Sequence, residues 1–217
     1  MLVGMSHMMT EVGLTVAVLT VDLRGWGDTH PSHDPYELYG WGAPERWLSY
    51  ISAALDDPVL GMRIRDGLTA LAYLRSRPET DPEQVVIGGH GMGGLVALHV
   101  AEIDGHVRGV FCDEILSSFQ TLAESPSYAW EHDVFFPNVL KYYDVPELAA
   151  DLRMPLLIVN PLDAMRRPLT PAAARQLYAQ ALARGNVEVQ AGLTGPQTYT
   201  TQVDWTNHLW QAAASVR

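Results

Sequence analysis

The feature that most constrains this chain is residues 85–100, which read Val-Val-Ile-Gly-Gly-His-Gly-Met-Gly-Gly-Leu-Val-Ala-Leu-His-Val. A short β-branched run passes through a glycine-rich turn straight into an apolar helical pattern. Glycine suits such a turn because closely approaching backbones leave no room for a Cβ atom. The stretch therefore predicts a strand, a very tight turn and a helix.

Length and composition limit the classes of protein to consider. The 217 residues, 47% of them hydrophobic, predict a single globular domain across residues 1–217. A formal net charge of -11 argues against a nucleic-acid partner. No run approaches the roughly 18 consecutive apolar residues of a membrane span, and the first residues lack the order of a signal peptide. We therefore expect no membrane association and, by default, a cytoplasmic location.

Short apolar runs alternate with helical patterns along the rest of the chain. Such alternation is typical of βαβ units, which build a parallel sheet with right-handed crossovers. The nearly continuous apolar run at residues 16–23 predicts a strand that is covered on both faces. Further strands are predicted at residues 107–112, 155–159 and 187–191, and helices at residues 1–13, 44–55, 64–72, 171–184 and 201–216.

Several motifs, taken together, resemble the α/β-hydrolase superfamily, and within it the bacterial acetyl-xylan-esterase-like enzymes. They are Val-Asp-Leu-Arg-Gly-Trp-Gly-Asp at residues 21–28, the runs at 60–66 and 73–79, Asp81-Pro82, and the glycine-rich turn. They occur in the expected order. The resemblance implies a three-layer α/β/α fold with a mostly parallel sheet, hydrolysis of carboxylic esters, and a small acylated substrate or ligand.

The turn departs from the family pattern at the catalytic position. In the family this nucleophile elbow reads G-x-S-x-G, and its serine attacks the ester carbonyl. The run from Gly89 to Gly93 fits that frame, but Gly91 occupies the serine position. Because glycine has no side-chain oxygen, an acyl-enzyme cannot form there. The backbone N–H of Met92 could still supply one oxyanion donor.

The resemblance also implies an acid and a histidine. Asp163 follows the predicted strand at residues 155–159 and matches the acid, although a loop aspartate can equally form an Asx turn. The loop at residues 192–201, where the histidine is expected, contains none. The remaining candidates for a general base are His208, which falls inside the predicted closing helix, and His90, beside the elbow.

The family's first three strands, and the loop that donates the other half of its oxyanion hole, have no counterpart in this sequence. In the family's strand order, the third strand lies between the strand matched by residues 16–23 and the elbow strand. Buried backbone without a hydrogen-bond partner is costly. We therefore expect a rearranged sheet, an intimate homodimer or a missing N-terminal segment.

Two further groups of polar residues could supply a different chemistry. Ser117, with Ser118, could provide a substitute hydroxyl, although serine at this point is also typical of a helix start. A metal-bound water could replace the serine altogether. The candidate ligands share one loop, which could equally be an ordinary solvated turn stiffened by prolines. They are Asp28, His30, His33 and Asp34. We expect no other cofactor.

Two hypotheses of function follow. In the first, the domain derives from an esterase, has lost the serine mechanism, and binds a ligand or contributes to an assembly. In the second, it is an active ester or lactone hydrolase with another nucleophile or with activated water.

The two hypotheses share a prediction for Gly91→Ser. A serine restored alone lacks its base, so we expect little serine-type turnover and little labelling by a fluorophosphonate probe. An active esterase of the same family serves as the positive control. Labelling of the variant at the rate of that control would contradict the prediction.

Overall fold

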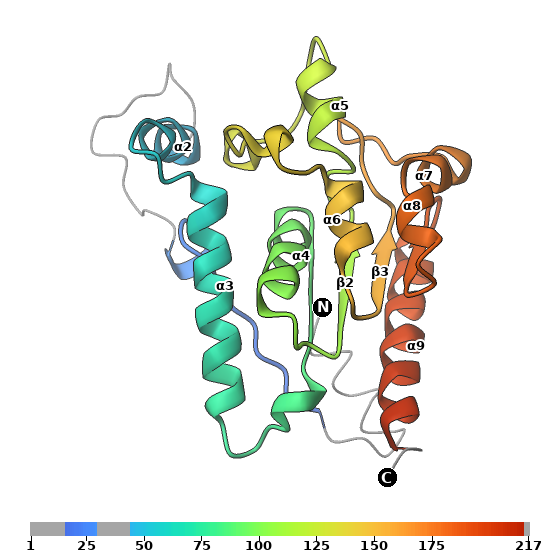
Figure 1. Ribbon diagram of the computed structural model, residues 1–217. Helices are drawn as coiled ribbons and strands as arrows, with labels where there is room; N and C mark the ends of the chain where they lie inside the picture. The colour runs from blue at the N-terminus through green and yellow to red at the C-terminus, as the bar shows by residue number, and fades with distance from the viewer. Residues whose placement is uncertain (1–15, 30–43, 215–217) are drawn as a thin grey trace.

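The computed structural model describes residues 16–29 and 44–214. Its centre is a sheet of four parallel strands in the order β1-β2-β3-β4. Figure 1 labels the two central strands, β2 and β3. Each strand is the neighbour of the one before it in the chain, which confirms the predicted parallel sheet. The strands are β1 (Val86–His90), β2 (Gly109–Asp113), β3 (Leu156–Val159) and β4 (Val187–Gln190).

Apolar sequence explains why the middle of the sheet is buried. All four residues of β3, Leu-Leu-Ile-Val, are buried, and β2 is buried except at Phe111. In β2 the Cys112 side chain is fully buried, and desolvation raises the pKa of its thiol. By contrast, β1 is only partly buried and Gly88 and His90 are exposed, because β1 forms the edge of the sheet.

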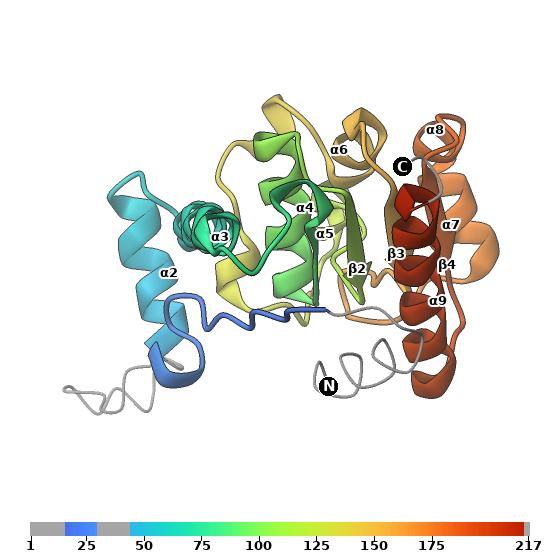
Figure 2. The same ribbon diagram turned by 90° about the horizontal axis from the view of Figure 1, so that it is seen from below.

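Helices cover both faces of the sheet. The helices α3 (Val59–Ser76), α4 (Met92–Asp104) and α6 (Val145–Asp151) lie on one face, and α9 (Gly195–Ala214) lies on the other (Figure 2). This arrangement confirms the three-layer architecture. The remaining α-helices are α2 (Pro44–Ala54), α5 (Phe119–Glu124), α7 (Pro171–Leu177) and α8 (Ala179–Leu182), and the 3-10 turns are Gly27–Thr29, Pro82–Gln84, His132–Val134 and Val139–Lys141.

Residues 16–23 differ from the prediction. They form no strand, and none of the described strands pairs with them. Residues 17–22 are exposed. An extended run of this composition becomes a strand only where a neighbouring backbone supplies hydrogen bonds. Here the nearest strand, β1, is separated from residues 16–21 by a cleft. The expected buried strand is therefore wrong. The expectation of a rearranged sheet, an intimate homodimer or a missing N-terminal segment stays a prediction.

Two helical predictions also need correction. The helix predicted at residues 171–184 is capped by Thr170, as its sequence indicates, but it divides at the buried Tyr178 into α7 and α8. The closing helix begins at Gly195, earlier than predicted. Thr194 bonds to Gln197 and the Thr198 N–H donates to the Thr194 carbonyl, so the first helical turn forms within the expected loop. The helix predicted at residues 1–13 lies outside the described residues.

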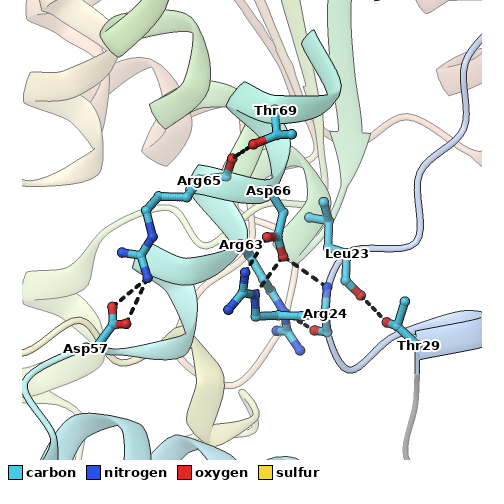
Figure 3. A network of polar contacts seen from close by, with 8 residues as sticks. All are labelled: Leu23, Arg24, Thr29, Asp57, Arg63, Arg65, Asp66 and Thr69. Carbon is cyan, nitrogen blue, oxygen red and sulfur yellow. Dashed lines mark hydrogen bonds and ion pairs between the residues drawn. The ribbon is translucent and has the colours of Figure 1, made fainter. Parts of the chain in front are cut away.

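One ion pair and several hydrogen bonds attach residues 23–29 to α3 (Figure 3). The exposed Arg24 donates to Asp66 through its backbone N–H and its guanidinium, with Nε 2.8 Å from Oδ2. This hydrogen bonding lowers the pKa of Asp66. One turn earlier in α3, the Nε of the fully buried Arg63 donates to the Arg24 carbonyl, and its guanidinium lies 4.1 Å from the Trp26 ring centroid.

Arg63 also forms a buried ion pair with Asp133, in the 3-10 turn after α5. One atom of each side chain, Arg63 Nη2 and Asp133 Oδ1, has no hydrogen-bond partner. The pair joins α3 to the segment that packs against α2. None of the described helices is long and apolar enough to cross a membrane.

The buried pair generates a stability prediction. Asp133→Leu leaves the Arg63 charge buried and uncompensated, so we expect the free energy of unfolding to fall by about 3 kcal/mol. The double variant Arg63→Met/Asp133→Leu removes both charges and should recover part of that loss. Urea denaturation of the three proteins measures both effects. A double variant less stable than the single one would contradict the prediction.

Candidate functional site

The turn after β1 is built by two different constraints on glycine. A Cβ at Gly89 would lie 2.4 Å from the carbonyl carbon of Gly93, and a Cβ at Gly94 would lie 2.6 Å from the Gly89 oxygen. These two glycines are required by the close approach of β1 and α4. Gly91 differs, because it has φ 55° and ψ -123° but nothing within 4 Å of where a Cβ would be.

Gly91 therefore has a backbone conformation that L side chains rarely adopt, beside open space. Its N–H donates to the Asp113 carbonyl at 2.7 Å, which anchors the turn to the end of β2. The helix α4 begins at the next residue, and Gly91 supplies no side-chain cap to it. The N–H groups of the first turn of a helix have no acceptor within the helix, so the N–H of Met92 is available to an oxygen atom placed at the elbow.

His90 is held against the end of β2. Its Nδ1 lies 3.1 Å from Asp113 Oδ2, and its Nε2 lies 3.7 Å from Glu114 Oε2. The other oxygen of Asp113, Oδ1, is buried and has no hydrogen-bond partner. The carboxylate therefore depends on His90 for compensation of its charge.

The electrostatics of this cluster favour the charged imidazole. The hydrogen bond to Asp113 raises the pKa of His90, while partial burial and the nearby Arg166 oppose that shift. The His90 side chain is 55% exposed, whereas that of Asp113 is 9% exposed. A buried carboxylate thus orients a half-exposed imidazole whose Nε2 can reach solvent or a ligand.

The loop after β3 contributes Arg166 and Asp163. Asp163 Oδ1 accepts hydrogen bonds from the N–H groups of Met165 and Arg167, so this oxygen closes a turn. Arg166, at φ 57°, lies over the Trp130 ring at 5.2 Å from its centroid. These contacts are those of an Asx-type turn, and among the described residues no histidine bonds to the Asp163 carboxylate.

The two serines have different surroundings. Ser118 is the N-cap of α5: its hydroxyl accepts from the Thr121 N–H and donates to Asp144. Ser117 is 1% exposed, and its carbonyl accepts from the buried Tyr178 hydroxyl. The two serines lie at the start of α5, as the helix-start alternative predicts, and neither hydroxyl bonds to a histidine within the described part of the chain.

His208 lies far from the elbow. Its neighbours in α9 contact the amino end of the sheet: the Leu209 carbonyl accepts from Arg108, just before β2, and Trp210 donates to the Gln84 carbonyl, just before β1. The elbow lies at the opposite, carboxyl end of β1. Because α9 runs antiparallel to the strands, its C-terminal half cannot bring His208 to Gly91. The prediction of His208 as a general base at the elbow is therefore corrected. His208 is exposed on the surface of α9.

Three of the four candidate metal ligands lie outside the described residues. His30, His33 and Asp34 are not described, and Asp28 is exposed, with its N–H donating to Asp22. Across residues 16–29 and 44–214, no group of three His, Cys, Asp or Glu side chains could hold a metal ion.

Three residues of the cluster escaped the sequence analysis: Asp113, Glu114 and Arg166. The available signal was the position of Asp113-Glu114 at the end of a predicted strand, because the carboxyl ends of parallel strands meet at one edge of the sheet. No comparable signal identified Arg166, which depends on a turn conformation with positive φ.

Comparisons with known proteins agree with this architecture. The profile of a family described as "Alpha/beta hydrolase family" matches residues 4–215. The "Putative hydrolase YtaP" of Bacillus subtilis (strain 168) is 25% identical over 146 residues, which are 66% of this chain and 44% of that protein. This chain therefore spans less than half the length of that relative.

Solved structures share the fold. A "putative acetyl xylan esterase" from Bacteroides fragilis superposes with a TM-score of 0.61 and 18% identity, over 78% of this chain and 45% of that chain. The acetyl xylan esterase from Paenibacillus sp. R4 gives a TM-score of 0.55 and 17% identity, over 86% of this chain and 63% of the other. At these identities the likeness is one of fold.

The His90–Asp113 pair predicts a pH dependence of stability. A pKa raised by folding stabilises the protein fully below the unfolded value of about 6.5, and this contribution is lost as pH rises through the folded-state pKa. We therefore expect His90→Gln to destabilise the protein more at about pH 5 than at about pH 9. Urea unfolding at both pH values measures the difference, and Asp113→Asn should lower the His90 pKa in an NMR titration. An equal loss at both pH values would contradict the prediction.

Proposed function

This chain belongs to the alpha/beta hydrolase family, and on that premise we propose that it is an esterase-derived domain that binds a small acylated ligand at the elbow without serine catalysis. The single observation that carries the proposal is Gly91 at the centre of the turn. Its φ and ψ are 55° and -123°, and open space surrounds the place of a Cβ. The family's scaffold is retained there while the attacking oxygen is absent.

The groups around the elbow support binding of an oxygen-bearing ligand. The Met92 N–H begins a helix of 13 residues, whose N-terminus attracts a carbonyl or carboxylate oxygen. His90 adds a donor, because its raised pKa favours the imidazolium form. Binding to these donors requires no nucleophile, whereas ester cleavage by the family's mechanism would require one.

One observation favours a second candidate, hydrolysis by activated water. Asp113 lies 3.1 Å from His90 Nδ1, which is the arrangement by which a carboxylate orients an imidazole for general-base chemistry. The base would be the Nε2 atom of neutral His90, and water would attack an ester or lactone carbonyl. The raised pKa counts against this candidate at neutral pH, because the imidazolium cannot accept a proton.

Hydrolysis of p-nitrophenyl acetate by highly purified protein separates the two candidates. If the domain only binds its ligand, the rate should equal that of His90→Gln and of Asp113→Asn, with or without a chelator. A rate that increases as pH rises through the His90 pKa, and that disappears in both variants, would instead establish the water mechanism.

Two further measurements complete this test. Asp163→Asn keeps an acceptor for the turn, so an unchanged rate in that variant separates turn formation from catalysis. Ligand binding is measured with p-nitroacetanilide, the amide analogue of the ester, by the NMR shift of the Met92 amide. No shift at millimolar analogue would contradict binding at the elbow.

A further inference from the structure

The carboxyl ends of β1, β2 and β3 bring charged side chains of both signs to one edge of the sheet. The register pairs His90 with Asp113, and Asp113 with Val159, so the three strand ends lie side by side. β1 and β3 are two strand spacings apart, which is roughly 10 Å. Charged groups at or after the ends of these strands can therefore contact the same small ligand.

Arg166 supplies a cation at this edge. It lies in the turn after β3, where its N–H donates to the Asp163 carbonyl at 3.0 Å. Its guanidinium lies over the ring of Trp130, which is buried and donates from Nε1 to the same carbonyl. Arg166 is exposed, and no described carboxylate forms an ion pair with it. The turn and the ring thus hold an unpaired positive charge.

His90 supplies a second cation, on the side of its ring that faces away from Asp113. The hydrogen bond to Asp113 occupies Nδ1 and raises the pKa of His90, whereas partial burial and the charge of Arg166 lower it. The imidazolium and the guanidinium therefore repel each other. An anion bound between His90 Nε2 and the Arg166 guanidinium would replace this repulsion by two attractions.

Glu114 lies beside the same ring nitrogen. Its Oε2 atom is 3.7 Å from His90 Nε2, which is within ion-pair distance but too long for a hydrogen bond. The Glu114 side chain is 39% exposed, so little free energy is needed to turn it toward solvent. Glu114 can therefore be displaced from His90 by an anion that forms a shorter contact.

We propose that the ligand at the elbow carries a carboxylate, which binds between His90 Nε2 and the Arg166 guanidinium in competition with Glu114. This binding mode rests on the proposed function, in which the Met92 N–H contacts the acyl oxygen of the ligand. The ligand class is then an acylated monocarboxylic acid. A monoanion suits the place better than a dianion, because Asp113 and Glu114 repel a second negative charge.

Two acetanilides that differ in one group test the preference for charge. p-Acetamidobenzoate has a carboxylate where p-acetamidobenzamide has a neutral amide. We expect the benzoate to bind about fivefold more tightly in an NMR titration of the Met92 amide. The benzoate should also raise the pKa of His90, because it binds the imidazolium form better, whereas the benzamide should leave that pKa unchanged.

The same titration distinguishes failure of this proposal from failure of the proposed function. If the two compounds shift the Met92 amide with equal affinity, ligand binding at the elbow stands and the carboxylate site is refuted. If neither compound shifts the amide, the proposed function fails as well. If the dianion p-acetamidophenyl phosphate binds more tightly than the benzoate, the choice of a carboxylate is overturned.

Two neighbouring arginines provide matched variants. Arg166→Met removes the charge over Trp130 and keeps an unbranched side chain, so it should weaken benzoate binding about fivefold and leave benzamide binding unchanged. Arg167→Met makes the same change one residue later, also at an exposed residue, and should bind both compounds like the unaltered protein. An equal loss of benzoate binding in the two variants would indicate non-specific attraction to positive charge and would refute the site.

Glu114→Gln should change the affinity in the opposite direction. The substitution removes the competing charge and keeps the size of the side chain, so benzoate binding should become about threefold tighter while benzamide binding stays the same. Weaker benzoate binding by Glu114→Gln would show that Glu114 supports the ligand, and the proposed competition would be wrong.

Discussion

The candidate site depends on the close contact between β1 and α4, where the backbones of Gly89 and Gly94 approach within the space of one Cβ atom. This contact fixes the direction in which α4 leaves the strand. It also forces the intervening turn into the positive φ of Gly91, whose N–H then bonds to the end of β2. The turn, the start of α4 and His90 are consequently held as one rigid unit.

Glycine has two different roles at this turn: one is required by packing, and the other leaves the family's catalytic position without a side chain. Gly89 and Gly94 have no room for a side chain, so they maintain the fold. Gly91 has room, and its lack of a side chain therefore does not follow from packing. The turn of the family can thus be kept without a side chain at its centre, and in the function that we propose the Met92 N–H and the His90 ring are the donors to a ligand.

Within the described residues, β1 has a neighbouring strand on one side only. The apolar strand lies at the edge of the sheet, beside a cleft, with residues 16–21 as a separate wall.

The sequence by itself determined the parallel sheet, the strand–turn–helix at residues 85–100 and the glycine at the serine position, because local apolar patterns and glycine spacing report directly on backbone geometry. It also provided both possible roles of Asp163 and of Ser118, whose contacts in the structure are those of a turn and a helix cap. Only tertiary structure decided that residues 16–23 pair with none of the described strands, since pairing requires a neighbour at hydrogen-bonding distance. Tertiary structure alone places His90 beside Asp113, Glu114 and Arg166, and His208 away from them. These positions depend on the order of the strands and the direction of α9, which a local sequence pattern does not contain.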